Sequence, residues 1–244
     1  MILRRFMKNV TKQNWLAVAL DMIVVIVGIF LGLQVQSWYD GREIKLQENK
    51  YLANLHQDIE ANLKLIFEGY SEQKDIQNGI INILDYYAGD KGLDALISAD
   101  CNALALSHKQ ANPISNLPVA QELISSGNFQ IISDENIRRA MSDYISILDL
   151  LRDRRESTQL FMVDLTSHYP EIIDVDLKIA RKRLENIPPS HQCHFEAGAT
   201  NTLFKNQLAM NSTRQWQLTR TIEEQLASLD KLHQLVDQRL GINH

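Results

Sequence analysis

The sequence predicts a mostly all-α protein, with one N-terminal transmembrane helix followed by an extramembrane helical bundle with long helices. Residues 15–35 form an apolar run, WLAVALDMIVVIVGIFLGLQV, that contains one charge. The segments after it space their apolar residues at the period of an α-helix. All five prolines lie between positions 113 and 189, and none interrupts the long helical segments, where proline would break the helix.

The apolar run has the length and the flanks of a membrane span. As a helix, its 21 residues cover about 31 Å, which is close to the thickness of a bilayer's hydrocarbon core. Trp15 lies at one edge, and Trp38 and Tyr39 lie just beyond the other. Aromatic side chains at both interfaces are typical of a spanning helix. We therefore expect a transmembrane helix over residues 15–38 with these three residues as interfacial anchors.

Two other interpretations of this run compete with a retained anchor. A buried core helix is seldom so long and so apolar on all sides. A cleaved signal peptide usually has an apolar region of about 7–15 residues and a small-residue cleavage site. This run is longer, carries Asp21, and ends in a poor cleavage site at 35–37. The sequence therefore favours an uncleaved anchor.

The charges predict the orientation of the anchor. The net charge is −5, but the first 39 residues hold four bases, Arg4, Arg5, Lys8 and Lys12, against one acid. Since basic flanks stay in the cytoplasm, we expect a cytoplasmic tail over 1–14 and a helical domain over 39–244 across the membrane. The remaining residues carry 21 bases against 29 acids. Such an acidic domain argues against nucleic acid as a partner.

The domain is expected to contain four long helical segments. The first is continuous or nearly so with the anchor, and Asn62 falls where a strict heptad would have an apolar residue, which makes a long left-handed coiled coil less favoured. The second covers 72–88, and loops and short helices follow over 89–118. The third opens at Ser133-Asp134-Glu135, a cap with first-turn acids, and continues towards Tyr169-Pro170. The last covers 200–240 with a heptad-like stripe that includes His233. Strands are at most marginal, near 129–132 and 171–177.

Three stretches resemble an uncharacterised family of bacterial single-pass membrane proteins, a domain of unknown function. They are VVIVGIFLGLQVQSW at 24–38, YLANLHQDIEAN at 51–62 and LISSGNFQIISDENIRRAMSDY at 123–144. The resemblance covers roughly the first 150 residues and implies a bacterial inner-membrane location with a periplasmic C-terminal domain. It implies no activity. Asp21 stands where the family pattern has Glu, which keeps the charge.

The two cysteines, Cys101 and Cys193, lie in the two irregular regions. In a periplasmic domain they are a candidate disulfide. His191, Cys193 and His194 also cluster, but their spacing matches no standard metal-ligand pattern, and two free thiols are the third possibility. We expect no metal and no cofactor.

Asp21 is the most informative polar residue, because a carboxylate inside a membrane is costly and usually has a partner or a function. At about 100° per residue, Gly28 and Gly32 lie roughly 20° to either side of Asp21. The three therefore share one face, which is a small-xxx-small packing surface with a polar group at one end.

The sequence contains no recognisable catalytic motif. Ser125-Ser126-Gly127-Asn128 is typical of a helix end rather than a nucleophile elbow. His233 on the apolar stripe is expected to be a core or seam histidine. We find no phosphate loop, dinucleotide fingerprint or metalloprotease motif.

Three classes of function remain open. The leading hypothesis is a membrane-anchored, non-enzymatic interaction or scaffold protein that associates with itself or another membrane protein through its transmembrane helix. The second is the small subunit of an ion-driven inner-membrane complex that uses a transmembrane Asp, although the domain lacks the mixed α/β pattern of such subunits. A periplasmic enzyme is the third. The partners expected are the lipid bilayer and a second membrane-embedded helix.

Overall fold

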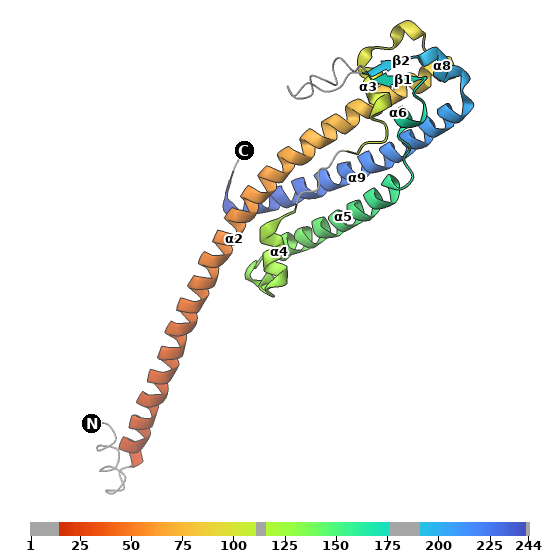
Figure 1. Cartoon of the computed structure of the whole chain (residues 1–244). Coiled ribbons are helices and arrows are strands. Elements are labelled where there is room, and N and C mark those ends of the chain that lie inside the picture. The colour runs from red at the N-terminus through yellow and green to blue at the C-terminus, as the bar shows by residue number, and fades with distance from the viewer. Residues whose placement is uncertain (1–14, 111–115, 176–190, 243–244) are drawn as a thin grey trace. The chain divides into compact units, whose positions relative to one another are not determined.

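The computed structural model describes residues 15–110, 116–175 and 191–242, and over these residues the protein is mostly α-helical, as predicted. Figure 1 shows the order of the elements, beginning with the long helix α2 (Trp15–Ala88). The chain forms two compact units, Met1–Tyr51 and Leu52–His244. The expected cytoplasmic tail over 1–14 lies outside the described residues.

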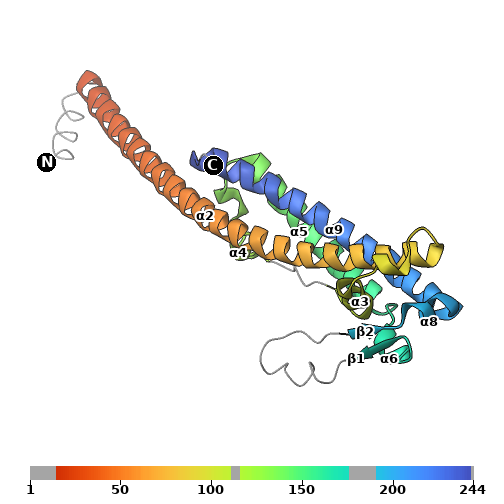
Figure 2. The ribbon, with the colours of Figure 1, turned by 90° about the horizontal axis from the view of Figure 1, so that it is seen from above.

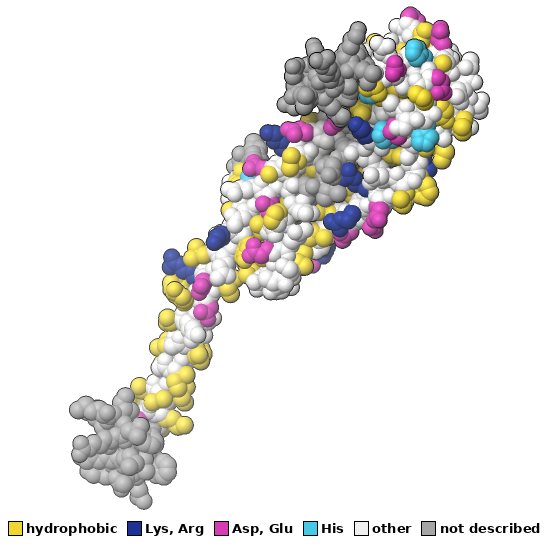
Figure 3. Space-filling view, in the orientation of Figure 1, with side chains coloured by type: hydrophobic (Ala, Val, Ile, Leu, Met, Phe, Trp, Pro, Cys, Tyr) yellow, Lys and Arg dark blue, Asp and Glu magenta, His cyan; other side chains and the backbone are white. Residues whose placement is uncertain are grey.

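In the first unit, α2 contains one stretch that is long and apolar enough to cross a membrane. Its most apolar 18-residue window has a mean hydropathy of 2.0, and none of that window is buried. Figure 3 shows hydrophobic side chains along this segment. A folded domain would bury a core helix of this composition, so the exposure agrees with a membrane candidate rather than a core helix.

The second unit is built on three long helices (Figures 1 and 2). They are α2 from Leu52 onwards, α5 (Glu135–Gln159) and α9 (Thr202–Leu240). α9 runs antiparallel to α2, because its early residue Phe204 meets Tyr87 whereas its later residue Glu223 meets Tyr70.

Buried residues of these three helices recur mostly at alternating spacings of three and four, which is the heptad pattern of packed helices, with one step of seven from Ile66 to Gln73 in α2. Asn62 occupies one of these positions and is buried, so a polar residue stands where a strict heptad would have an apolar one, as the sequence indicated. Its side-chain amide donates to the carbonyl of Asn116 at 2.8 Å, which satisfies the buried polar group. The heptad positions are Leu52, Leu55, Ile59, Asn62, Ile66, Gln73, Ile76, Ile80 and Ile83 in α2, Ile137, Met141, Tyr144, Leu148 and Leu151 in α5, and Phe204, Leu208, Asn211, Gln215, Leu218, Ile222, Gln225, Leu229, Leu232 and Val236 in α9.

The predicted boundary between a first helix and a second one at 72–88 is also wrong, since α2 continues without a break to Ala88. No proline interrupts the segment, and α9 holds it across the predicted junction. The Tyr70 hydroxyl donates to Glu223 at 2.8 Å, and Lys74 pairs with the same carboxylate at 3.0 Å. α2 ends where Gly89 adopts a left-handed conformation with φ of +88°.

Two residues of α2 anchor the short helix α4 (Pro118–Ser125). Asp58 accepts the backbone N–H of Val119 at 3.1 Å, which places a carboxylate at the N-terminus of α4 as a capping side chain would. Asn62, one turn later on the same face, binds the chain just before it. α4 ends before Gly127, which has a φ of +73°, so the predicted glycine stop is confirmed.

α5 begins as predicted and ends earlier. The Asp134 carboxylate caps it by accepting the N–H groups of Asn136 at 2.8 Å and Ile137 at 3.4 Å. The helix ends at Gln159 instead of continuing towards Tyr169-Pro170. The backbone of Val163 turns away to bind the buried side chain of Asn211, with distances of 3.0 and 2.8 Å. Asp164 then caps the short helix α6 (Leu165–His168).

The remaining elements gather around the start of α9. They are the 3-10 helix η1 (Leu93–Ala95), α3 (Ser98–Ala105), β1 (Ile173–Val175), β2 (His191–Cys193) and α8 (Phe195–Thr200). The two strands pair antiparallel, with Ile173 opposite Cys193. A strand near 171–177 is therefore confirmed. The other marginal strand is wrong, since 129–131 forms the 3-10 helix η2 (Phe129–Ile131).

A hydrophobic cluster joins these elements to α2 and α9. Phe204 is its centre, with the Tyr169 ring edge-on at 5.1 Å and the Tyr87 ring at 6.2 Å. Gly79 allows α3 to lie close to α2, because a Cβ atom there would fall 2.4 Å from that of Ala103. The cluster is formed by Ile76, Ile80, Ile83, Ala103, Leu104, Ala105, Leu165, Tyr169, Ile172, Ile173, Phe204 and Leu208.

Candidate functional site

The first candidate surface is the face of α2 that carries Asp21, Gly28 and Gly32. A Cβ atom added at either glycine would meet no described atom within 4 Å. Asp21 is partly buried, and its Oδ2 atom accepts no hydrogen bond from the described residues. This face therefore combines room for close helix approach with a partly buried carboxylate.

Two of the three expected interfacial aromatics can be placed. Trp38 and Tyr39 are exposed, by 67% and 64%, at the end of the apolar segment. Trp15 is the first residue of α2, but its side chain lies outside the described residues. An exposed pair of amphipathic rings is suited to the polar edge of a bilayer.

The second candidate region surrounds the two cysteines. Cys101 of α3 and Cys193 of β2 are joined by a disulfide with a Cα–Cα distance of 5.6 Å. Because both sulfur atoms are bonded to each other, they cannot supply thiolates, so the cysteine-histidine metal site considered from the sequence does not form. The bond closes a loop across 92 positions and fixes the small sheet to α3.

Two histidines lie near this disulfide. Burial lowers the pKa of His108, although the carboxylate of Asp164 at 3.6 Å acts against this effect. Burial also lowers the pKa of His191, whose Nδ1 lies 3.3 Å from the amide oxygen of Asn102. Burial therefore favours the neutral form of both imidazoles.

The third candidate is a cluster of histidines and carboxylates between α2 and α9, which the sequence analysis missed. His56 Nε2 lies 3.0 Å from Asp237 Oδ1, and His233 Nε2 lies 3.5 Å from Asp237 Oδ2. On its other side, His56 Nδ1 lies 3.6 Å from Glu60 Oε2. The two imidazole rings are 5.0 Å apart.

Helical spacing positions this cluster. His56 and Glu60 are four residues apart on α2, and His233 and Asp237 are four apart on α9, so each pair shares one face of its helix. His233 follows the buried heptad residue Leu232. It therefore lies at the edge of the helix contact, which agrees with the expectation of a seam histidine. The two i,i+4 pairs were visible in the sequence, but that they face each other follows from the antiparallel packing of the helices.

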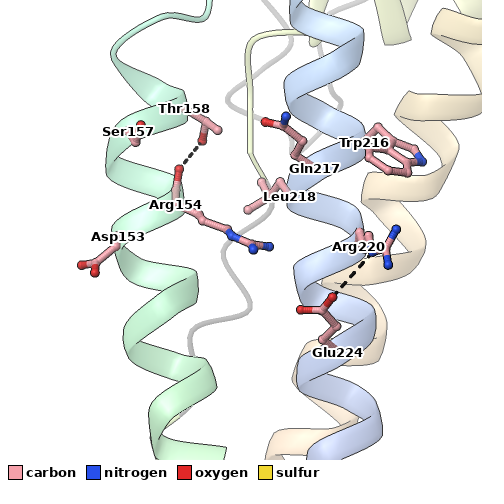
Figure 4. A pocket seen from close by; sticks show the side chains of 9 residues that line it. All are labelled: Asp153, Arg154, Ser157, Thr158, Trp216, Gln217, Leu218, Arg220 and Glu224. Carbon is pink, nitrogen blue, oxygen red and sulfur yellow. Dashed lines mark hydrogen bonds and ion pairs between the residues drawn. The ribbon is translucent and has the colours of Figure 1, made fainter.

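The fourth candidate is a groove of about 660 Å³ between α5 and α9 (Figure 4). Arg154 reaches from α5 and donates to the Thr221 hydroxyl at 2.6 Å. Arg220 pairs with Glu224 at 3.6 Å and lies over the Trp216 ring. No histidine or cysteine is among its described lining residues. The groove therefore offers paired charges and an exposed indole rather than a nucleophile beside a base.

Comparison with known proteins finds no relative of this chain. No family model, no curated protein and no solved structure matches this chain.

Proposed function

We propose that this chain is a membrane-anchored, non-enzymatic interaction or scaffold protein of a bacterial inner membrane. Its N-terminus lies in the cytoplasm, its helical domain lies in the periplasm, and its transmembrane helix associates with a second copy or with another membrane protein. The observation that carries the proposal is the apolar segment of α2, whose most apolar window has no buried residue and therefore needs an apolar surrounding.

Association through the helix is supported by its face with Asp21, Gly28 and Gly32. In lipid, helices pack where small residues let their backbones approach closely, and a polar side chain strengthens the contact by bonding across it. Both glycines have open space around them, and Asp21 supplies the polar side chain on the same helix face.

The periplasmic location rests on two independent features. The four bases before Trp15 favour a cytoplasmic N-terminus. The disulfide between Cys101 and Cys193 favours an oxidising compartment, since disulfides seldom persist in the cytosol.

A second candidate function is a subunit of an ion-driven complex, in which Asp21 carries a proton. The observation that favours it is the position of Asp21 within the apolar segment. An acid inside a membrane is tolerated when it is protonated or paired, and a protonated acid can carry a proton. This candidate predicts a different response to removal of the acid, so one set of variants separates the two.

The test measures assembly by crosslinking in native membranes and function by a growth or stress phenotype of the deletion strain. If Asp21 only supports association, Asp21→Asn keeps both, because Asn still forms hydrogen bonds. Gly28→Leu and Gly32→Leu then abolish the crosslinked species by blocking close approach. If Asp21 carries a proton, Asp21→Asn removes function while assembly stays intact.

Ala19→Leu is the matched control. Ala19 lies nine residues before Gly28, which is about two and a half helical turns, so the two residues are on opposite sides of the helix. It adds the same bulk to the opposite face and should leave the crosslinks unchanged. Equal crosslinking of the wild type and both glycine variants would contradict association through this face. An Asp21→Ala protein with wild-type assembly and phenotype would refute both roles of the acid.

A further inference from the structure

We propose that His56, Glu60 and His233 bind a divalent transition-metal cation, with Zn²⁺ as the expected ion, and that Asp237 orients the two imidazoles. The site would join α2 to the C-terminal part of α9. It is independent of the membrane anchor and goes beyond the function proposed above.

The geometry of the donor atoms carries the proposal. Each of the three residues offers one ligand atom, and these atoms all lie within 4.8 Å of one another. Ligand atoms around a tetrahedral Zn²⁺, at about 2.0–2.1 Å from the metal, are roughly 3.4 Å apart. Closing the site therefore requires shifts of at most about 1.4 Å, which side-chain rotation can supply.

The burial of the residues matches the roles assigned to them. The side chains of His56 and His233 are exposed by 12% and 15%, so the two imidazoles are held in place by the packed helices. The Glu60 side chain is 52% exposed. It can thus move onto an ion and leaves a path by which the ion enters.

Asp237 supplies the support that metal-bound histidines require. Its two oxygens lie beside the Nε2 atoms of His56 and His233, at 3.0 and 3.5 Å. A carboxylate that contacts ligand imidazoles fixes their orientation and raises their basicity. If Asp237 instead enters the coordination sphere, the donor set becomes two imidazoles and two carboxylates, which is complete for a tetrahedral ion.

The donor types select the class of metal. Imidazole and carboxylate together suit Zn²⁺ and its neighbours Co²⁺, Ni²⁺ and Cu²⁺, whereas Mg²⁺ and Ca²⁺ prefer oxygen ligands. The two cysteines are bonded to each other and take no part.

The test uses the full-length protein, purified in detergent without a histidine tag and stripped with a chelator. Titration with ZnCl₂ in a calorimeter should show one saturable site per chain, and Zn²⁺ should raise the melting temperature of the protein. Co²⁺ in place of Zn²⁺ should give the visible absorption of a four-coordinate ion. MgCl₂ at the same concentration should do neither.

Glu60→Gln is the decisive variant, because Glu60 is half-exposed and its loss leaves the packing unchanged. It should weaken Zn²⁺ binding at least tenfold while the melting temperature in chelator stays at the wild-type value. His233→Gln should abolish binding, and Asp237→Asn should weaken it by about 10–100-fold. If His233→Gln does not fold, Glu60→Gln still decides the question.

The matched control is His168→Gln, which removes an exposed histidine of α6 and should bind Zn²⁺ as the wild type does. Two results would overturn the proposal. One is wild-type protein without saturable Zn²⁺ binding. The other is equal affinity in the wild type and Glu60→Gln, which would mean that the cluster is a structural contact between helices.

Discussion

At the scale of single residues, Cys193 connects two parts of the domain that the chain alone would leave loosely joined. It belongs to a strand of three residues, and its partner Cys101 belongs to an eight-residue helix. Such short elements are marginal by themselves, because few hydrogen bonds offset the entropy lost on ordering them. The covalent bond and the hydrophobic cluster around Phe204 together compensate for their small size.

We predict that this bond is present in natively purified protein and that its removal destabilises the domain. Closing a loop of 92 positions lowers the entropy of the unfolded chain by an amount worth about 4–5 kcal/mol in the loop-closure model. The variant Cys101→Ala with Cys193→Ala should therefore unfold at clearly lower urea concentration. Peptide mapping of unreduced protein should recover the linked pair. Two freely alkylated thiols would contradict the prediction and weaken the periplasmic assignment with it.

At the scale of elements, the polar heptad residues of α9 explain where the connecting loops lie. Gln215 donates to the carbonyls of Ser107 and Lys109 at 2.7 and 2.6 Å, and its oxygen accepts a hydrogen bond from Gln73. Asn211 binds the backbone of Val163. Two loops therefore find their hydrogen bonds inside the bundle, in places where an apolar residue would leave backbone groups unsatisfied.

We predict that Gln215→Leu destabilises the protein, although it makes the heptad more hydrophobic. The two loop carbonyls and the Gln73 amide lose their partner, and each buried unsatisfied group costs about 1–3 kcal/mol. Thermal unfolding followed by circular dichroism should show a fall in melting temperature. Gln217→Leu is the control, because Gln217 is exposed two residues further along α9 and should change the melting temperature little. A Gln215→Leu protein as stable as the wild type would refute the assigned role.

The same elements show what the sequence could predict. Apolar periodicity correctly indicated the helical segments, and capping residues correctly located the Asp134 cap and the stop at Gly127, because these signals are local. The end of α5 at Gln159 and the unbroken course of α2 past Tyr70 depend on contacts with α9, which periodicity does not contain. The contact between His56 and His233 was missed for the same reason. The register of two helices that are far apart in the chain is fixed by their packing.

At the scale of the whole molecule, the two units differ in the side chains that they expose. The first unit exposes apolar side chains and carries a face of small residues with one acid. The second unit buries an apolar core between its helices, and Figure 3 shows side chains of both charges over its visible surface. The composition of the first unit is typical of a segment that faces lipid, and the composition of the second is typical of a domain that faces water.

We predict that the second unit lies in the periplasm, since the residues before the apolar segment include Arg4, Arg5, Lys8 and Lys12. Basic residues resist transfer to the outer side, and the flank with more of them stays in the cytoplasm. A reporter that is active only in the periplasm should be active when fused after Leu240, and one that works only in the cytoplasm should be silent there. Changing all four bases to Gln should lower the periplasmic signal, whereas changing four bases of α9 should not. The opposite reporter pattern would reverse the orientation, and recovery of the fusion in the soluble fraction would show that the apolar segment is cleaved rather than retained.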